Sequence, residues 1–318
     1  MSLRPPALRP GDQVALVSPS GPVPAARVEA AVEVLSGWGL KPRVYPHALG
    51  RHLYFGGTDQ ERIDDFNSAV SDPANRAVWC TRGGYGMQRI VDRLDVEQLA
   101  RRPRLIIGFS DITALHLAVW RRAGLATLHG PVAAQLDKGP DSLTAQGIFK
   151  AMMTDSPVTL FATPEEGTHS VTTSGRSSGV LIGGNLSLLA ASVGTPDQPD
   201  LDGTILLLED VNEEEYRVDR MLTHLLRSRL LDRVAGVAIG QFTNCGPAVA
   251  DVITDRLAPL GLPLLGGLPV GHGDQHVAVP LGTPATLDAD AGTLVVSPAA
   301  MVLPATTIAS TNQSLTST

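Results

Sequence analysis

The sequence predicts an α/β protein that has two domains and a mostly parallel β-sheet. Short apolar runs alternate with amphipathic helical patterns through the first half of the chain, and this alternation is typical of βαβ units. The chain has 318 residues, which is too long for one ordinary domain and suits two. Hydrophobic residues make up 43% of the sequence, enough for sizeable cores.

The first half of the chain opens with a strand–turn–helix pattern. The apolar run at residues 12–21 predicts a buried strand that ends in a turn. In residues 24–39 apolar side chains recur at helical spacing until glycines end the pattern, which predicts one amphipathic helix. The elements that follow alternate in the same way: strands at 41–46, 76–86, 104–110 and 126–132, and helices at 58–73, 87–94 and 111–124.

The composition changes in the middle of the chain. Residues 137–178 are rich in Thr, Ser, Gly and Pro, which indicates a crossing between domains. We therefore expect a first domain at 1–136 and a second domain at 179–304. Residues 305–318 lack an apolar pattern and are expected to form a disordered tail.

The second domain is expected to contain strands, two helices and a hairpin. A strand, a glycine turn and a helix capped by Asn185 occupy 179–196. A buried strand followed by a long helix occupies 203–231. The remaining expected elements are strands at 234–242 and 263–272 and a hairpin at 285–297.

Composition also narrows the classes of function. The formal net charge is −7, from 25 basic and 32 acidic residues, and no basic stripe is present, which argues against a nucleic-acid partner. No apolar run is long enough to span a membrane, and residues 1–11 lack the apolar core of a secretory signal. The two cysteines, Cys80 and Cys245, lie far apart without metal-binding spacing, so we expect buried thiols in a reduced, cytoplasmic enzyme.

Ser110 directly follows a predicted strand and precedes a helical pattern, in the stretch Gly108-Phe109-Ser110-Asp111. One interpretation is a helix cap, a role that Asp111 would fill equally well. The other is a nucleophile held on a sharp turn, with the free N–H groups of the following helix available to bind an oxyanion. The nucleophile elbow of α/β-hydrolases has the pattern G-x-S-x-G, and its final glycine is missing here.

A serine nucleophile needs a base, and His272 is the first candidate among the eight histidines. It lies between two glycines just after an apolar run, which suits a loop that directs a side chain into a cleft. His276 is the second candidate. His116 is expected to pack within its helix, whereas His129 ends a predicted strand and is a further candidate to line the same cleft.

Three further positions have the chemistry that a serine enzyme needs. Glu209 follows four apolar residues, and a carboxylate at the end of a buried strand needs a partner such as an imidazole N–H. Arg82 and Gly84 belong to a glycine-rich stretch at 82–86, between a predicted strand and a helix. The simplest interpretation of this stretch is a tight turn between the strand and the helix. We favour an N–H donor loop that places Gly84 beside Ser110 and lets Arg82 pair with a substrate carboxylate.

Seven stretches together resemble the LD-carboxypeptidases, the muramoyltetrapeptide carboxypeptidase family of serine peptidases. They occur in the family's order and cover the chain to about Leu281. The matching stretches are LRPGDQVALVSPSGPV, RGGYGMQRIVDRLD, IIGFSDITALH, HGPV, GVLIGGNLSLLAASVGTP, LLLEDVNEEEYRVDRMLTHL and GLPVGH.

The resemblance implies a role for five residues. Ser110 corresponds to the family's nucleophile, Glu209 to its acid and His272 to its base, and the backbone N–H groups of Asp111 and Gly84 correspond to its oxyanion-binding donors. It also implies a flavodoxin-like N-terminal parallel-sheet domain and a smaller C-terminal α/β domain, with the active site between them, in a homodimer.

The activity implied by the resemblance is hydrolysis of murein tetrapeptide by acyl transfer, which releases the terminal D-alanine during cell-wall recycling in the cytoplasm. No metal or other cofactor is required, and no nucleic-acid or membrane partner is expected. The sequence leaves open whether diaminopimelate or lysine precedes D-alanine. It also leaves open whether Arg82 and Asn185 bind the substrate, because a helix cap explains Asn185 equally well.

Two alternative functions accompany this prediction. A branch of the same family related to microcin immunity uses the same three residues on acylated adenylates and needs stacking groups for a nucleobase. This chain has three tryptophans, all within predicted elements, which favours the tetrapeptide. The second alternative is a non-catalytic flavodoxin-like module that binds a phosphate at the glycine-rich turn of residues 83–86.

Overall fold

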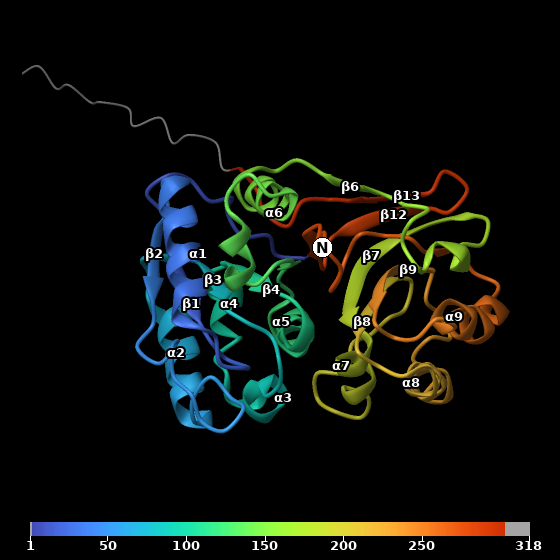
Figure 1. Ribbon diagram of the computed structural model, residues 1–318, viewed down its shortest axis with the longest axis horizontal. Helices are drawn as coiled ribbons and strands as arrows, with labels where there is room; N and C mark the ends of the chain where they lie inside the picture. Colours follow the sequence, from blue (N-terminus) through green and yellow to red (C-terminus); the bar gives the residue numbers. More distant parts are fainter. Residues whose placement is uncertain (1, 303–318) are drawn as a thin grey trace, which may run out of the picture.

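The computed structural model describes residues 2–302, which form two β-sheets with helices packed against them (Figure 1). The first sheet consists of β1 (Gln13–Val17), β2 (Lys41–Val44), β3 (Asn75–Cys80), β4 (Leu105–Gly108), β5 (Thr127–His129) and β11 (Val279–Leu281). Its spatial order is β11-β5-β4-β3-β1-β2. The neighbouring pairs from β2 to β5 are parallel, and only β11 is antiparallel to its neighbour.

The second sheet is larger and mixed. It consists of β6 (Val158–Phe161), β7 (Arg176–Asn185), β8 (Ile205–Val211), β9 (Gly236–Thr243), β10 (Leu264–Leu265), β12 (Pro284–Asp288) and β13 (Thr293–Val296). The order is β10-β9-β8-β7-β12-β13-β6, with parallel pairs from β10 to β7 and antiparallel pairs from β7 to β6. The predicted α/β fold and the mostly parallel first sheet are confirmed.

The helices cover the sheets and follow the predicted alternation. The α-helices are α1 (Ala25–Gly37), α2 (Asp59–Ser71), α3 (Met87–Ile90), α4 (Gln98–Arg101), α5 (Thr113–Ala123), α6 (Leu143–Met153), α7 (Leu186–Ala191), α8 (Glu215–Arg227) and α9 (Val249–Leu257). Short 3₁₀ segments are η1 (Val91–Arg93), η2 (Ser110–Ile112), η3 (Ala133–Lys138), η4 (His169–Val171) and η5 (Ala258–Leu260). Thr58 begins α2 with a capping box to Glu61, which shows how local side-chain chemistry sets a helix start.

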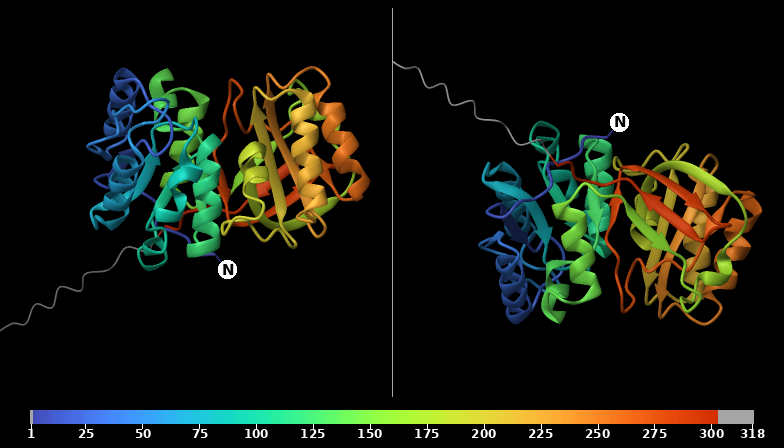
Figure 2. Two further views of the ribbon diagram at one scale, coloured as in Figure 1. Left: turned by 90° about the horizontal axis from the view of Figure 1, so that it is seen from below. Right: turned by 90° about the horizontal axis from the view of Figure 1, so that it is seen from above.

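Helix α5 joins the two halves of the molecule. It packs against β5 of the first sheet and against β7 and α7 of the second. Its Leu117 belongs to the hydrophobic core formed by the helices and strands of the second sheet. Figure 2 shows the two halves side by side, with the middle of the chain at their junction. Residues at the start of α5 therefore lie close to groups from the second half.

The structure differs from the predicted element plan in three places. Residues 137–178, predicted as a crossing, contain α6 and β6, because a Thr- and Ser-rich segment still suits an edge strand with one buried side chain. The strand predicted at 263–272 is reduced to β10, because the glycines and proline that follow it interrupt pairing. Strand β11, from the predicted second domain, pairs with β5 of the first sheet.

The predicted division of the chain into domains stays a prediction. The chain crosses between the two sheets after β5 and returns with β11 before β12. The tail predicted at 305–318 lies outside the described residues.

Candidate active site

Ser110 lies on a strained turn between β4 and α5. Its φ angle is 63°, in the left-handed region that a residue with a side chain enters at a cost of about 1–3 kcal/mol. Phe109 before it is extended, and the 3₁₀ turn η2 leads from Ser110 directly into α5. This strand–turn–helix geometry is that of a nucleophile elbow, although the final glycine of the motif is absent.

The helix-cap interpretation of this turn is not supported. Within the described part of the chain, neither η2 nor α5 has a side-chain cap at its N-terminus. The carboxylate of Asp111 instead accepts a hydrogen bond of 2.8 Å from the backbone N–H of Met87. The hydroxyl of Ser110 is therefore not used by helix capping.

The glycine-rich loop after β3 lies against Ser110, and Gly83 makes the closest approach. A side chain at Gly83 would place its Cβ 2.9 Å from Ser110 Cβ and 3.2 Å from Ser110 Oγ, so only glycine fits there. The N–H of Gly21 donates to Gly83 O at 2.9 Å and holds the loop. Gly84 follows with φ of 108° and lies against Gly21, so the residue of this loop that meets Ser110 is Gly83. A role of the Gly84 N–H as an oxyanion donor stays a prediction.

His272 and Glu209 form a hydrogen-bonded pair across 63 residues of sequence. His272 Nδ1 lies 2.7 Å from Glu209 Oε2. Glu209 lies on β8 and is fully buried, whereas the His272 side chain is 18% exposed. A Cβ at Gly271 would lie 2.8 Å from Glu209 Oε2, and this glycine has φ of 131°. Glycine at 271 therefore lets the loop approach the carboxylate closely.

Burial dominates the electrostatics of this pair. It raises the pKa of the Glu209 carboxyl, and the hydrogen bond from His272 opposes that rise. Oε1 of Glu209 has no hydrogen-bond partner among the described residues. With Glu209 ionised, Nδ1–H of His272 donates to it, and the lone pair on Nε2 is left to accept a proton.

Phe109 links the strained turn to the histidine pair. Its ring centroid lies 4.6 Å from that of His272, so the residue next to Ser110 is in contact with the candidate base. The His272–Glu209 pair, from the loop after β10 and from β8, therefore contacts the residue that precedes Ser110 on the turn between β4 and α5.

The remaining predicted histidines form a buried cluster near Phe109. His276 lies edge-on to Phe109 at 4.3 Å, and burial lowers its pKa to about 3. His129 lies 5.5 Å from His276, and burial also lowers its pKa. His116 Nε2 donates to Gly108 O at 2.8 Å and is packed, as predicted. His276 has no carboxylate partner among the described residues, so the arrangement favours His272 over it.

Arg82 and Asn185 already have partners in the protein. Arg82 is exposed, and its Nη1 donates to Pro22 O at 2.6 Å. Asn185 is buried and caps α7 by accepting from Leu188 N. Its Nδ2 also donates to the carboxylate of Asp210 at 2.9 Å, so the capping interpretation accounts for this side chain. A role of either residue in substrate binding stays a prediction.

Gln241 is a site residue that the sequence did not reveal. Its Oε1 accepts from Gly273 N at 2.7 Å, and its Nε2 donates to Gln275 O at 3.2 Å and to Glu166 Oε1 at 2.7 Å. These bonds hold the loop that carries His272. The available signal was a polar residue at the end of the apolar run of β9.

A pocket of about 520 Å³ opens beside His272. It is lined by Thr163, Glu165, Glu166, Gln241, Thr243, Pro269, His272, Gly273, Asp274 and Gln275. The acidic side chains give this pocket a negative character, which suits a ligand group with positive charge.

The two cysteines are buried, and the described residues form neither a metal site nor a membrane-spanning helix. Cys80 and Cys245 are buried free thiols, and burial raises the pKa of Cys245 to about 11. Across residues 2–302, no set of three or more His, Cys, Asp and Glu side chains is arranged to hold a metal ion. None of the helices in that range is long and apolar enough to cross a membrane.

The fold and this junction together define a class of enzyme. A serine on a strained strand–helix turn, backbone N–H groups at a helix start, and a histidine oriented by a buried carboxylate are the elements of a serine-type hydrolase.

Comparison with known proteins identifies the family within that class. The chain belongs to the LD-carboxypeptidase family: residues 14–130 match its N-terminal domain and residues 178–287 its C-terminal domain. The family prediction and the assignment as a serine-type peptidase are confirmed.

Two curated relatives are similar over almost the whole chain. A putative carboxypeptidase of Streptomyces coelicolor is 47% identical over 309 residues, covering 95% of this chain and 98% of that protein. A murein tetrapeptide carboxypeptidase of Pseudomonas aeruginosa is 35% identical over 290 residues, covering 87% and 93%.

Solved structures agree with the sequence relatives. A muramoyltetrapeptide carboxypeptidase from Oxalobacter formigenes has a TM-score of 0.80 at 28% identity, covering 92% of this chain and all of that chain (100%). The microcin C7 self-immunity protein, in complex with glutamyl sulfamoyl guanosine, has a TM-score of 0.81 at 25% identity, covering 93% and 98%.

Proposed function

We propose that this protein is an LD-carboxypeptidase that removes the terminal D-alanine from murein tetrapeptide. The observation that carries the proposal is the His272–Glu209 pair held against the strained turn of Ser110. The substrate follows from relatives named for murein tetrapeptide and muramoyltetrapeptide hydrolysis.

The first half of the reaction forms an acyl-enzyme. His272 Nε2 takes the proton from Ser110 Oγ, and Oγ attacks the carbonyl carbon of the bond that precedes D-alanine. The oxyanion is held by the N–H of Asp111 at the helix start and by the N–H of Gly84 in the glycine loop. His272 then gives its proton to the nitrogen of D-alanine, and the C–N bond breaks.

The second half reverses these roles with water as the nucleophile. His272 takes a proton from water, the hydroxide attacks the acyl carbon, and Ser110 Oγ leaves with the proton from His272. Glu209 stays ionised and stabilises the imidazolium that forms in both halves. The buried position of Glu209 strengthens this interaction because little water screens it.

Two further features of the site support a peptide substrate that carries charged groups. Exposed Arg82, beside the glycine loop, would pair with the C-terminal carboxylate of the substrate. The acidic pocket beside His272 suits the ammonium group of diaminopimelate or lysine.

The second candidate is a peptidase of the microcin-immunity type, acting on aminoacyl adenylates. The similarity to the microcin C7 self-immunity protein favours it. Both candidates use the same three residues, so the substrate decides between them. A cytoplasmic location and a homodimer are further parts of the proposal and follow from the family resemblance.

The test is mass spectrometry of murein tetrapeptide incubated with the wild type, with Ser110→Ala and with Ser36→Ala, an exposed serine of α1. The wild type and Ser36→Ala are expected to release D-alanine. Ser110→Ala is expected to lose about 10⁶-fold in rate. Cleavage by Ser110→Ala at the wild-type rate would contradict the serine mechanism. Cleavage of an aminoacyl sulfamoyl adenylate but not of tetrapeptide would establish the second candidate instead.

A further inference from the structure

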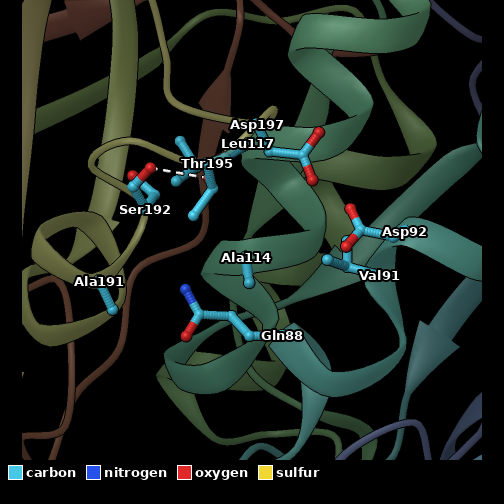
Figure 3. Close-up of a pocket in the computed structure, with 9 residues that line it drawn as sticks. All are labelled: Gln88, Val91, Asp92, Ala114, Leu117, Ala191, Ser192, Thr195 and Asp197. Atoms are coloured by element: carbon cyan, nitrogen blue, oxygen red, sulfur yellow. Dashed lines mark hydrogen bonds between the residues drawn. The ribbon is translucent and has the colours of Figure 1, made fainter.

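A small pocket lies between α5 and the α7 segment, and none of the residues assigned above to the active site lines it. Its volume is about 150 Å³. Figure 3 shows the nine lining residues: Gln88, Val91, Asp92, Ala114, Leu117, Ala191, Ser192, Thr195 and Asp197. One wall comes from α3, η1 and α5, and the opposite wall comes from the end of α7 and the loop after it.

The pocket contains a buried carboxylate, one oxygen of which has no hydrogen-bond partner among the described residues. Asp197 is only 6% exposed, and its Oδ1 has no hydrogen-bond partner among the described residues. A second carboxylate, that of Asp92, points toward it from the other wall (Figure 3). Burying a carboxylate without a partner costs several kcal/mol, so a site of this kind favours a bound cation.

Two hydroxyls of the pocket are available as acceptors, and the Gln88 amide offers both an acceptor and a donor. The hydroxyl of Ser192 donates to Leu189 O at 2.7 Å, and that of Thr195 donates to Ser192 O at 2.7 Å. Their lone pairs are left for a donor. Among the lining residues described, no side chain is basic. The two carboxylates and the hydroxyl lone pairs therefore favour a ligand that supplies donors and positive charge.

The nearest arginine does not neutralise the pocket. Arg122 lowers the pKa of Asp197, but burial raises it more, and Asp92 and Glu97 also raise it. The guanidinium of Arg122 is held by Glu97 at 2.8 Å and by the carbonyls of Val91 and Leu94.

We infer that this pocket binds a small aliphatic primary amine in its ammonium form. The ammonium has three donors for the Asp197 and Asp92 carboxylates and the neighbouring oxygens. Val91, Ala114, Leu117 and Ala191 supply an apolar wall for a short carbon stem. Such a ligand would connect α5, which begins at the Ser110 turn, to the loop after α7.

The amine is a free molecule and not the side chain of a peptide bound at Ser110. Asp197 interacts electrostatically with Arg121 and Arg122, at the far end of α5 from Ser110. Leu117 is already seven residues beyond Ser110, which is about 10 Å along a helix axis. The four-carbon stem of a lysine does not span that length. A ligand with its own carboxylate is disfavoured by the two aspartates.

The inference is tested by thermal unfolding with n-butylammonium chloride, with 1-butanol and sodium butyrate as neutral and anionic controls at constant ionic strength. A ligand at 100 times its Kd is expected to raise the wild-type Tm by about 5 °C. Asp197→Asn is expected to reduce the rise below about 1 °C, while Asp200→Asn, an exposed aspartate nearby, leaves it unchanged. Ala191→Phe fills the pocket without changing charge and is expected to abolish the rise.

Three outcomes would overturn the inference. They are an equal rise with 1-butanol, a rise with MgCl₂ but none with butylammonium, and a butylammonium effect that survives both Asp197→Asn and Ala191→Phe. Titration calorimetry of butylammonium supplies the Kd and requires no enzymatic activity. The result is therefore independent of the substrate proposed above.

Discussion

Residues 2–302 contain two histidine–carboxylate pairs with nearly the same local geometry. His272 Nδ1 lies 2.7 Å from Glu209, and His47 Nδ1 lies 2.8 Å from Asp65. Both carboxylates are buried, and both imidazoles are partly exposed, at 18% for His272 and 38% for His47. Burial raises the pKa of each carboxyl, and the histidine bond opposes the rise in each.

The two pairs differ in what else they contact. Asp65 Oδ2 accepts from the backbone N–H of His47 at 2.9 Å, so both of its oxygens hold one loop against α2. The second oxygen of Glu209 has no such partner among the described residues, and the His272 ring contacts Phe109 beside Ser110. A histidine–carboxylate pair thus becomes a candidate catalytic unit only through a neighbouring nucleophile and an open pocket.

Removal of the base is the largest expected effect. His272→Ala is expected to lower kcat/KM for murein tetrapeptide by about 10⁶-fold, because Ser110 then lacks a proton acceptor. His47→Ala is expected to change kcat/KM by less than about twofold, because its pair serves a loop. Steady-state release of D-alanine measures both. Similar losses of kcat/KM in the two variants would show that the two histidine–carboxylate pairs do not differ in function.

The next largest effect is expected from replacing Glu209, the carboxylate partner of His272. Glu209→Gln is expected to lower kcat by about 10⁴-fold, because a neutral amide neither stabilises the imidazolium nor selects the required tautomer. Circular dichroism and thermal unfolding check that the variant is folded. An activity within tenfold of the wild type would remove Glu209 from the mechanism.

His276 shows what burial does to a histidine without an acid partner. Its folded-state pKa of about 3 lies below the ordinary value of 6.5, so the unfolded chain binds more protons between these values. Stability contributed by the neutral ring is therefore lost as pH falls below 6.5. Its neighbours include Phe109, His129 and His272, which supply no negative charge.

The free energy of unfolding of the wild type is expected to fall between pH 7 and pH 4. The fall is expected to be about 3 kcal/mol smaller in His276→Gln, because this variant lacks the buried imidazole. Urea unfolding at both pH values measures the difference. His52→Gln, at an exposed histidine, is the control and is expected to follow the wild type. Equal pH dependence in His276→Gln and the wild type would contradict the effect of burial.

The smallest effect is expected at Asp65. Asp65→Asn weakens the bonds to His47 and is expected to cost about 1 kcal/mol of stability, or a few degrees in Tm. Activity is expected to stay within about twofold of the wild type. A large loss of kcat/KM in a variant that stays folded would instead assign the His47 pair a functional role.

Most of the candidate site residues could be predicted from local sequence patterns. Ser110 and Glu209 both follow apolar strand runs, one in each sheet, and functional groups commonly lie at the carboxyl ends of parallel strands. The glycines beside His272 indicated a loop that approaches another group, and Gly271 does approach Glu209. The family motifs supported the same residues. These features are local, so periodicity and turn chemistry were enough to predict them.

Other features depend on contacts between distant segments. His272 and His276 are four residues apart and were both candidates, yet only His272 meets Glu209. Gln241 gave little local signal because its role is to hold a loop that lies 32 residues further along.

The sequence by itself determined the alternation of strands and helices, the family, and a short set of candidate residues, because each depends on patterns within a few residues. Tertiary structure alone decided that β11 joins the first sheet, that Asn185 binds Asp210, and that Oδ1 of Asp197 is buried without a hydrogen-bond partner in residues 2–302. These outcomes follow from how segments far apart in the chain pack together. Strand register, burial and the distance between two side chains are properties of that packing, and local periodicity does not encode them.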